Sequence, residues 1–275
     1  MKKRDYKKEF CALISQLAPQ YSKWKIWTDF LDLSAISMAN VIPTPEMKAR
    51  EEKYHSIINS YRKEEQEIFA QMLSLVVLAL EDNPAQDFLG SLYHNLELHQ
   101  EQKGQFFTPY HISEFMSELQ SSEKDTNEII QKNGYISVCD PACGAGAMLI
   151  AFANVAKKHN INYQTQVLFV AQDIDHTAAM MCYIQLSLLG CPAIIAIGNS
   201  ITEPFPHPNN DVWYTLFYYL NRQRFTSEVA EENQQDCVDP TNKINVTIHA
   251  NNLSENLKMI ESADGQFVLD LENIS

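Results

Sequence analysis

Hydrophobic side chains recur every three or four residues through most of residues 1–100, and this spacing predicts helices. We expect one helix up to Pro19 and a second up to Pro43. A long third helix is expected from Thr44, a suitable N-cap, to Leu80, and a fourth helix follows it. The pattern therefore predicts an all-helical N-terminal domain over residues 1–100.

Beyond residue 100, short apolar runs alternate with longer amphipathic segments. The expected strands are residues 136–139, 167–171 and 193–197. Three helices are expected: one that begins near Ser113, one over residues 147–158 and one over residues 176–189. Strands that alternate with helices favour a parallel sheet, so we expect an α/β core over residues 101–220. The remainder, residues 221–275, starts with an acidic linker over 228–239. A strand at 243–249, a helix at 253–260 and a strand at 266–271 would follow and complete the same core sheet.

Charge limits the partners that this chain can bind directly. The net charge is −14, and residues 111–275 contain 20 acidic against 8 basic side chains. Because DNA affinity comes largely from neutralised phosphates, the chain is not expected to bind DNA alone. The one basic cluster is Lys2, Lys3, Arg4, Lys7 and Lys8, with Lys23 and Lys25 after it. A solvated helix face is the favoured interpretation of this cluster over DNA contact.

The six cysteines show no paired spacing and no matching histidines, so neither zinc nor a disulfide framework is indicated. We interpret them as buried free thiols of a reducing, cytoplasmic compartment. No signal peptide pattern opens the chain, and the longest apolar run, residues 72–80, is half a membrane span.

Candidate chemistry is concentrated where the first expected strand ends. Asp140 is followed by Gly144 and Gly146 and then by a helix, which gives a strand, a tight loop and a helix start. Such a loop lets the backbone approach a ligand, although a capping aspartate with turn glycines is the plain structural alternative. A third glycine of the dinucleotide fingerprint would fall at Leu149, so a NAD site is disfavoured.

Four segments, in this order along the chain, resemble N6-adenine DNA methyltransferases, above all the modification subunits of type I restriction enzymes. They are Gly-Gln-Phe-Phe-Thr-Pro at 104–109, Asp-Pro-Ala-Cys-Gly-Ala-Gly at 140–146, Gln-Asp-Ile-Asp at 172–175 and Gly-Asn-Ser at 198–200. The resemblance implies a Rossmann-like, S-adenosylmethionine-dependent methyltransferase sheet preceded by a helical domain. It implies that the cofactor is bound by Gln105, Phe106, Phe107, Thr108, Pro109, Asp140, Pro141, Ala142, Gly144, Gly146, Asp173, Ile174 and Asn199.

The resemblance also assigns roles to these residues. Asp140 would accept hydrogen bonds from the cofactor's ammonium group, and Asp173 would bind the ribose hydroxyls rather than merely cap a helix. Ile174 would pack on the adenine ring, and the amide of Asn199 would meet its amino edge. The segment from Gln105 to Pro109 would fold over the cofactor, and Asp175 would cap the next helix.

The catalytic loop of the family, Asn/Asp-Pro-Pro-Tyr/Phe, does not occur in the sequence. Adenine methylation needs a flipped base, an acceptor for its amino hydrogens and a stacking aromatic ring. Asn209 or Asn210 with Trp213 or Tyr214 could form a rearranged base pocket. Loss of the catalytic loop is the favoured interpretation of this part of the sequence.

Two functions therefore follow from the sequence. The first is DNA adenine-N6 methylation in a restriction-modification system, with target recognition delegated to a specificity-type subunit in a hetero- or homo-oligomer. The second is a catalytically inactive S-adenosylmethionine-binding relative that acts as a scaffold, a regulator or an acidic DNA mimic.

Overall fold

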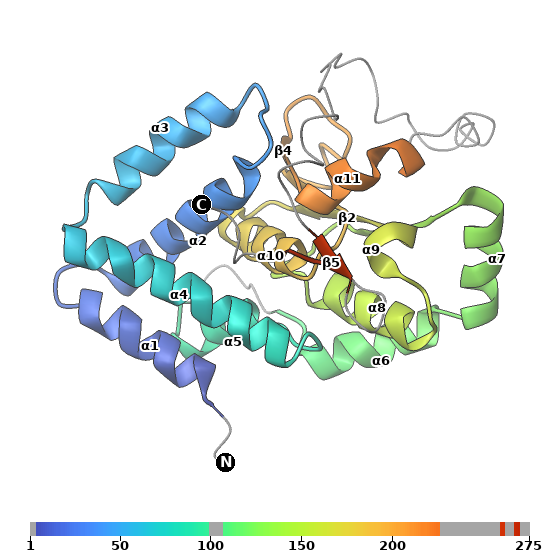
Figure 1. Cartoon of the computed structure of the whole chain (residues 1–275), viewed down its shortest axis with the longest axis horizontal. Helices are drawn as coiled ribbons and strands as arrows, with labels where there is room; N and C mark the ends of the chain where they lie inside the picture. The colour runs from blue at the N-terminus through green and yellow to red at the C-terminus, as the bar shows by residue number, and fades with distance from the viewer. Residues whose placement is uncertain (1–3, 99–106, 226–258, 262–266, 270–275) are drawn as a thin grey trace.

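The computed structural model describes residues 4–98, 107–225, 259–261 and 267–269. Its centre is a four-stranded sheet in the order β1-β2-β3-β4, with helices packed around it (Figure 1). The strands are β1 (Ile136–Asp140), β2 (Val167–Asp173), β3 (Ala193–Ile197) and β4 (Asp211–Tyr214). The first three strands are parallel, and β4 pairs antiparallel with β3. The fold is therefore a mixed α/β fold with a mostly parallel sheet, as predicted.

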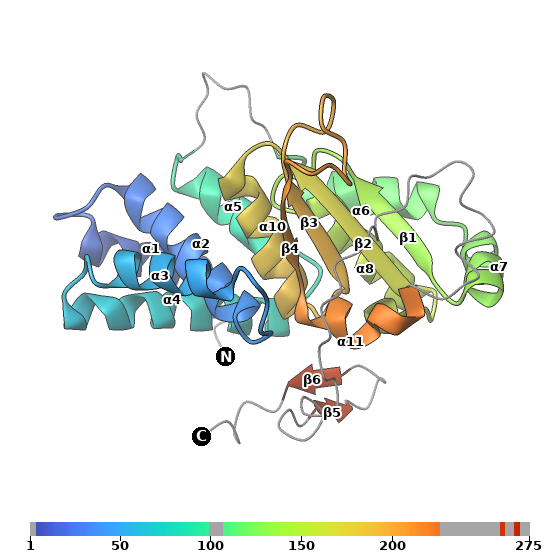
Figure 2. The same cartoon turned by 90° about the horizontal axis from the view of Figure 1, so that it is seen from above.

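Helices at the N-terminal end of the chain lie on the β4 side of the sheet (Figure 2). They are α1 (Tyr6–Leu17), α2 (Lys23–Ala39), α3 (Met47–Ile58), α4 (Lys63–Asp82) and α5 (Phe88–Asn95). Their buried side chains, such as Trp27 and Phe30, belong to the same hydrophobic cluster as Phe169 of β2. The N-terminal helices and the sheet therefore share one hydrophobic core. The division into a helical domain up to residue 100 and a core domain up to residue 220 stays a prediction.

The prediction of one long third helix is wrong, because the helix is interrupted between α3 and α4. The backbone N–H of Arg62 donates to Glu65 Oε2 over 2.9 Å, which caps a new helix start. The ring of Tyr61 is buried at the break, and its hydroxyl donates to Asp29 Oδ2 over 2.6 Å. Thr44 is not an N-cap: α3 begins at Met47, and the Thr44 hydroxyl is buried without a hydrogen bond.

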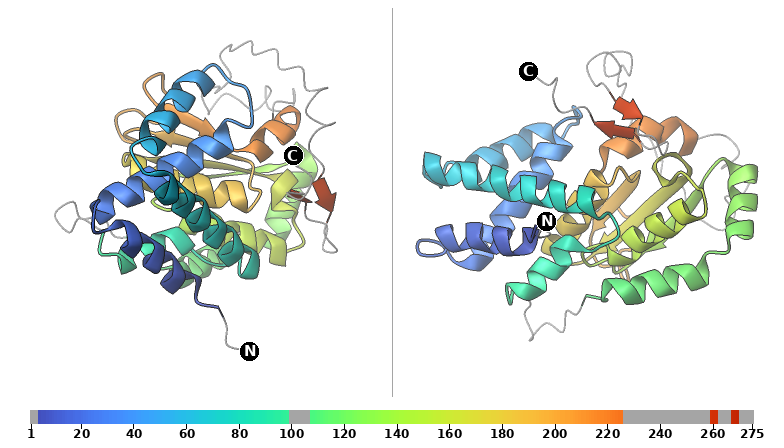
Figure 3. Two further views of the ribbon diagram at one scale, coloured as in Figure 1. Left: turned by 60° about the vertical axis from the view of Figure 1, so that its left-hand side comes forward. Right: turned by 60° about the horizontal axis from the view of Figure 1, so that its bottom comes forward.

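The second half of the chain follows the predicted alternation of strand and helix. The helices are α6 (Tyr110–Gln120), α7 (Glu123–Asn133), α8 (Ala147–Lys158), α9 (Tyr163–Gln166), α10 (His176–Leu188) and α11 (Leu216–Phe225). Gly146, at φ +91°, precedes α8, and Gly190, at φ +72°, follows α10, so glycines stand where the backbone is left-handed. The rings of Phe152 on α8 and Phe169 on β2 meet edge to face, which places α8 against the sheet. Helix α10 also packs on β2 and β3 and joins the sheet to α2 (Figure 3).

Two short strands near the C-terminal end are β5 (Met259–Glu261) and β6 (Phe267–Leu269), and within the described part of the chain they pair only with each other. They form a separate antiparallel sheet, so they do not complete the core sheet as expected. The strand expected at 266–271 agrees with β6, whereas the helix expected at 253–260 is wrong at its end, where β5 begins. The acidic linker at 228–239 and the strand expected at 243–249 lie outside the described residues. Among the helices of the described residues, none has the length and apolar character needed to span a bilayer.

Candidate functional site

The carboxyl ends of β1, β2 and β3 are neighbours in the sheet. Asp140 is in register with Ala171, and Asp173 is in register with Ile197. The loop after β3 is tied to β2, since Gly198 N donates to the Asp173 carbonyl oxygen over 3.0 Å. Open α/β sheets bind their ligands at this edge. The sheet thus brings together the three strand ends on which Asp140, Asp173 and Asn199 were predicted to form a site.

Asp173 is the central acid of this edge. Its Oδ2 accepts from Gly144 N over 2.8 Å, and its Oδ1 accepts from Asp175 N over 2.9 Å. Burial raises the pKa of Asp173, and these N–H donors oppose the rise. Each carboxylate oxygen has a second lone pair, so the side chain can still accept hydrogen bonds from a ligand. Asp175 caps α10 by accepting from Thr177 N over 2.8 Å, as predicted.

Asp140 stands on the neighbouring strand with a looser set of contacts. Its Oδ1 accepts from Ala142 N over 3.1 Å, which fixes the turn through Pro141 and Ala142. Burial raises the pKa of Asp140, the Ala142 N–H lowers it, and the charge of Asp173 raises it again. Two carboxylates that sense each other at one edge favour a cationic ligand group, because such a group relieves both their burial and their repulsion.

Phe107 covers the glycine loop. A Cβ on Gly144 would lie 2.9 Å from Phe107 Cδ1, and Gly144 itself has φ +54°. The ring of Phe107 also lies 5.3 Å from Tyr93 and 5.4 Å from His94, both on α5. The structure thus holds Phe107 against the glycine loop, and the role of its segment as a cover for the cofactor stays a prediction. Thr108 and Pro109 are exposed beside it, and Gln105 and Phe106 lie outside the described residues.

The two remaining predicted contacts flank Asp173. The side chain of Ile174 is 68% exposed, so it has an apolar surface without protein cover. Asn199 Oδ1 accepts from Ile201 N over 2.9 Å and from Thr202 N over 3.3 Å, so this oxygen forms the turn that starts the next loop.

Two buried glutamines, to which no role was assigned from the sequence, support the site. Gln172 binds the loop after β3, because its Nε2 donates to Glu203 O over 3.0 Å and its Oε1 accepts from Phe205 N over 2.9 Å. Gln185 on α10 donates to the Ala145 carbonyl oxygen of the glycine loop over 2.8 Å and to Asp87 over 2.9 Å. A polar residue within an apolar strand or helix was the one available signal for both.

The four weak catalytic candidates lie at two different places: Asn209 and Asn210 directly precede β4, next to the carboxyl end of β3, whereas Trp213 and Tyr214 lie farther along β4. Asn209 Nδ2 donates to Glu203 Oε1 over 2.7 Å, and Asn210 Nδ2 donates to the Glu203 carbonyl oxygen over 3.2 Å. Trp213 is buried between the Arg50 guanidinium, 4.0 Å from the ring, and Tyr183, 5.4 Å from it. Tyr214 pairs with Ile194, near the amino end of β3, and so lies away from the carboxyl edge.

The cysteines of the described residues are free thiols. Cys143, Cys182 and Cys191 are buried as expected, but Cys139 is exposed on β1 and Cys11 is half-buried. The neighbouring thiol of Cys182, together with burial, raises the pKa of Cys143. Cys143 in the glycine loop is therefore a neutral thiol rather than a nucleophilic thiolate.

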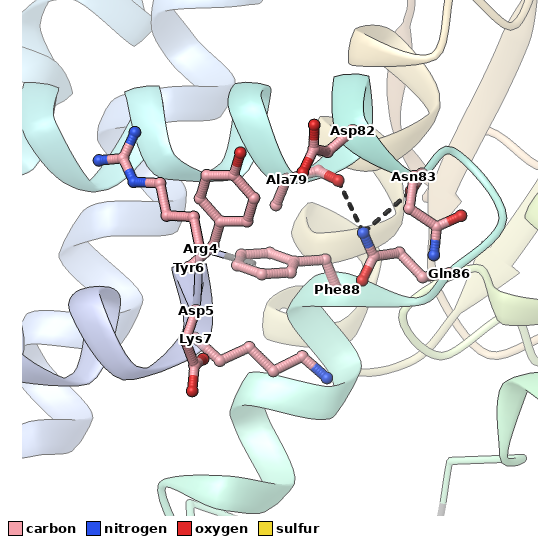
Figure 4. A pocket seen from close by; sticks show the side chains of 9 residues that line it. All are labelled: Arg4, Asp5, Tyr6, Lys7, Ala79, Asp82, Asn83, Gln86 and Phe88. Atoms are coloured by element: carbon pink, nitrogen blue, oxygen red, sulfur yellow. Dashed lines mark hydrogen bonds between the residues drawn. The ribbon is translucent and has the colours of Figure 1, made fainter. Parts of the chain in front are cut away.

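A cavity of about 320 Å³ lies away from these strand ends, between the start of α1 and the end of α4 (Figure 4). Arg4, Tyr6, Asp82 and Gln86 line it.

Two members of the basic cluster predicted near the start of the chain form ion pairs. The Arg4 guanidinium is paired with Glu9 at 2.8 Å, and Lys25 is paired with Asp29. These ion pairs support a solvated helix face rather than a phosphate site.

Comparison with known proteins shows a similar protein and a matching family. The chain is 32% identical over 85 residues to the type I restriction enzyme MpnII methylase subunit of Mycoplasma pneumoniae. That alignment covers 31% of this chain and 14% of the relative, so the chain spans a small part of the relative's length. The family described as N-6 DNA Methylase matches residues 85–246, which is more than half of the chain and includes every strand end described above. The chain therefore belongs to the N-6 DNA methylase family.

Proposed function

We propose that the chain binds S-adenosylmethionine at the strand ends and holds the methyl donor of a DNA adenine-N6 methyltransferase. The observation that supports this most is the joint arrangement of Asp140, Asp173 and the Gly144 loop beneath Phe107. The family implies the cofactor, and this donor set suits its chemical groups.

The residues fit the cofactor group by group. Asp140 would bind the ammonium group, since a half-buried carboxylate with a raised pKa is relieved by a cation. Asp173 would accept from the ribose hydroxyls through its remaining lone pairs, and the exposed Ile174 would pack on the adenine ring. The Asn199 amide would contact the adenine edge through its nitrogen, because its oxygen already accepts two backbone N–H groups.

When bound, the cofactor supplies an electrophilic methyl group on a sulfonium. The contribution of this chain is positioning: Phe107 and the glycine loop would exclude water, and the two aspartates would fix the orientation of the donor. Of the four catalytic candidates, Trp213 is buried within the fold and Tyr214 lies near the amino end of β3, so neither ring is offered to a flipped adenine at this edge. We therefore infer that the acceptor base is presented together with a partner, such as a specificity-type subunit, in a cytoplasmic restriction-modification assembly.

A second candidate function rests on a specific observation. The Pro-Pro-aromatic loop is absent from the sequence, and the net charge is −14. Both facts favour a cofactor-binding protein that acts as a scaffold, a regulator or an acidic DNA mimic without turnover.

Two measurements test these proposals. Titration calorimetry with S-adenosylmethionine should show saturable heat with the parent protein, and the absence of heat would reject both functions. Transfer of a labelled methyl group to unmethylated DNA, with and without specificity-type subunits, separates them. Incorporation that depends on the partner supports the methyltransferase, whereas silence in every mixture together with intact cofactor binding supports the inactive relative.

A further inference from the structure

A mostly buried carboxylate on α2 contacts the start of α10. Asp32 Oδ1 lies 2.8 Å from His176 Nε2, and Asp32 Oδ2 lies 2.8 Å from Lys53 Nζ on α3. The side chain of Asp32 is 14% exposed, whereas those of His176 and Lys53 are 42% and 45% exposed. The acid therefore lies largely inside the fold, and its two partners reach it from the surface. We call these three residues the Asp32 cluster.

Asp32 is ionised in this cluster. Burial raises the pKa of Asp32, but the hydrogen bonds from His176 and Lys53 and the charge of Lys53 outweigh burial, so the pKa lies below its ordinary value. An ionised carboxylate has no proton to donate, so His176 Nε2 is the donor. Because the acid is largely buried, this pair constrains the histidine ring more than a pair of exposed charges would.

His176 ends the turn that joins β2 to α10. We call residues 173–176 the adenosine turn, because Asp173 and Ile174 are the residues proposed for the ribose and the adenine ring. Within the turn, Asp173 Oδ1 accepts from Asp175 N over 2.9 Å, and Ile174 is 68% exposed. The adenosine turn is thus an exposed link between β2 and α10, both of which are largely buried.

The Asp32 cluster holds the adenosine turn from the side of the N-terminal helices. At the other end of the turn, Asp173 is tied to the glycine loop and to the loop after β3. The ring of His176 instead ties the turn to α2, along which α10 packs (Figure 3). Lys53 binds the second oxygen of Asp32, so the acid is itself anchored from α3. The turn is therefore held at both ends, by the sheet at Asp173 and by Asp32 at His176.

We propose that Asp32 is a positioning residue for the methyl-donor site and acts through His176. Asp32 fixes the His176 ring, and the ring fixes the adenosine turn that presents Asp173 and Ile174 to the nucleoside of the cofactor. Without the cluster, binding has to order the turn, which costs affinity. This assignment rests on the proposed function, because it gives α2 and α3 a part in binding the same cofactor.

The first test measures amide hydrogen exchange of residues 173–177 in the full chain without a ligand. His176→Ala removes the donor, and His55→Ala is the matched control, since His55 forms an exposed pair with Glu51 at 3.2 Å on α3. Exchange of the turn should be at least about threefold faster in His176→Ala, because one hydrogen bond is lost. In His55→Ala it should change less than about twofold. Equal exchange in the parent and His176→Ala would overturn the proposal.

The second test is titration calorimetry with S-adenosylmethionine. His176→Ala should weaken binding about three- to tenfold, the range that one hydrogen bond commonly contributes. His176→Gln should recover most of the loss, because its amide nitrogen can donate to Asp32. Asp32→Ala should weaken binding by a similar factor, and the double variant should bind no more weakly than His176→Ala, since both changes remove one interaction. His55→Ala should bind within about twofold of the parent.

The outcomes separate this proposal from the proposed function. Parent-like affinity in His176→Ala, an equal loss in His176→Gln, or losses that add in the double variant would overturn the role of Asp32. The His176 variants decide the matter by themselves if Asp32→Ala does not fold. Absence of heat with the parent protein would instead reject the proposed function, and the exchange experiment would then decide whether the cluster orients the turn.

Discussion

The backbone N–H of Gly144 donates to Asp173 Oδ2 over 2.8 Å, so the loop after β1 and the acid that ends β2 form one unit. A ligand that binds Asp173 therefore meets a carboxylate whose position the loop already fixes. Such preorganisation reduces the entropy lost on binding.

Asp173→Ala should weaken S-adenosylmethionine binding about 10- to 100-fold, because a hydrogen bond to a charged group contributes about 1.5–3 kcal/mol. Asp173→Asn should lie between the parent and the alanine variant, since it keeps one acceptor oxygen. Glu128→Ala, an exposed acid on α7, is the control of equal charge change. Titration calorimetry is the measurement, and parent-like affinity in Asp173→Ala would contradict the assigned role.

Gly144 and Gly134 form a matched pair of positions that tests whether Phe107 packs against the glycine loop. Both have positive φ, +54° and +80°, but only a Cβ at Gly144 would meet Phe107, at 2.9 Å. Gly134→Ala should lower the free energy of unfolding by about 1 kcal/mol, and Gly144→Ala by about 2–3 kcal/mol. In the Phe107→Ala background the extra cost at Gly144 should disappear. Urea unfolding measures all four variants, and equal costs at the two glycines would show that Phe107 does not press on the loop.

The elements around the site could be predicted because each is specified by its own residues. Residues 147–158 and 193–197 match α8 and β3 at both ends. Gly146 precedes α8, Gly190 and Gly198 lie on either side of β3, and mostly apolar runs lie between these turns. These local signals suffice for such short elements. The parallel direction of the first three strands follows from the same alternation.

The failures occurred where distant contacts decide the structure. The break before α4 depends on Tyr61, which is buried against Tyr21 and Phe69, and charged residues on either side are equally compatible with one helix. The alternation at 266–271 predicted a strand but carried no information about its pairing partner. Gln172 and Gln185 were missed because their role depends on the carbonyl and N–H groups that the fold brings to them.

Gln185 joins α5, α10 and the glycine loop through buried hydrogen bonds. Its Oε1 accepts from Phe88 N over 2.8 Å, and its Nε2 reaches Asp87 and Ala145. Gln185→Leu keeps the volume but leaves these groups unsatisfied, so the free energy of unfolding should fall by about 3 kcal/mol. Gln71→Leu, on the exposed face of α4, should change it by less than about 0.5 kcal/mol. A chemical unfolding series that shows equal midpoints for both variants would contradict this account.

The raised pKa of Asp140 predicts a pH dependence with a definite sign. Because burial raises the pKa in the folded state, the folded protein retains this proton more tightly than the unfolded chain. The contribution of Asp140 to stability is thus present below the ordinary pKa of 3.8 and is lost as the pH rises through the raised value. Asp140→Asn should therefore be more stable than the parent near neutral pH, and the difference should vanish at about pH 3.

Cofactor binding should depend on the same group in the opposite direction. If the ionised Asp140 binds the ammonium group, the affinity of the parent for S-adenosylmethionine should fall as the pH drops through the raised pKa. Asp140→Asn should bind at least about tenfold more weakly near neutral pH, since it lacks the charge, and should show a flatter pH profile. Urea unfolding and calorimetry across the acidic range, with Glu128→Gln as the control, measure both trends. If Asp140→Asn is more stable near neutral pH and yet binds with the parent's affinity and pH profile, the burial of Asp140 is confirmed and its role in cofactor binding is rejected.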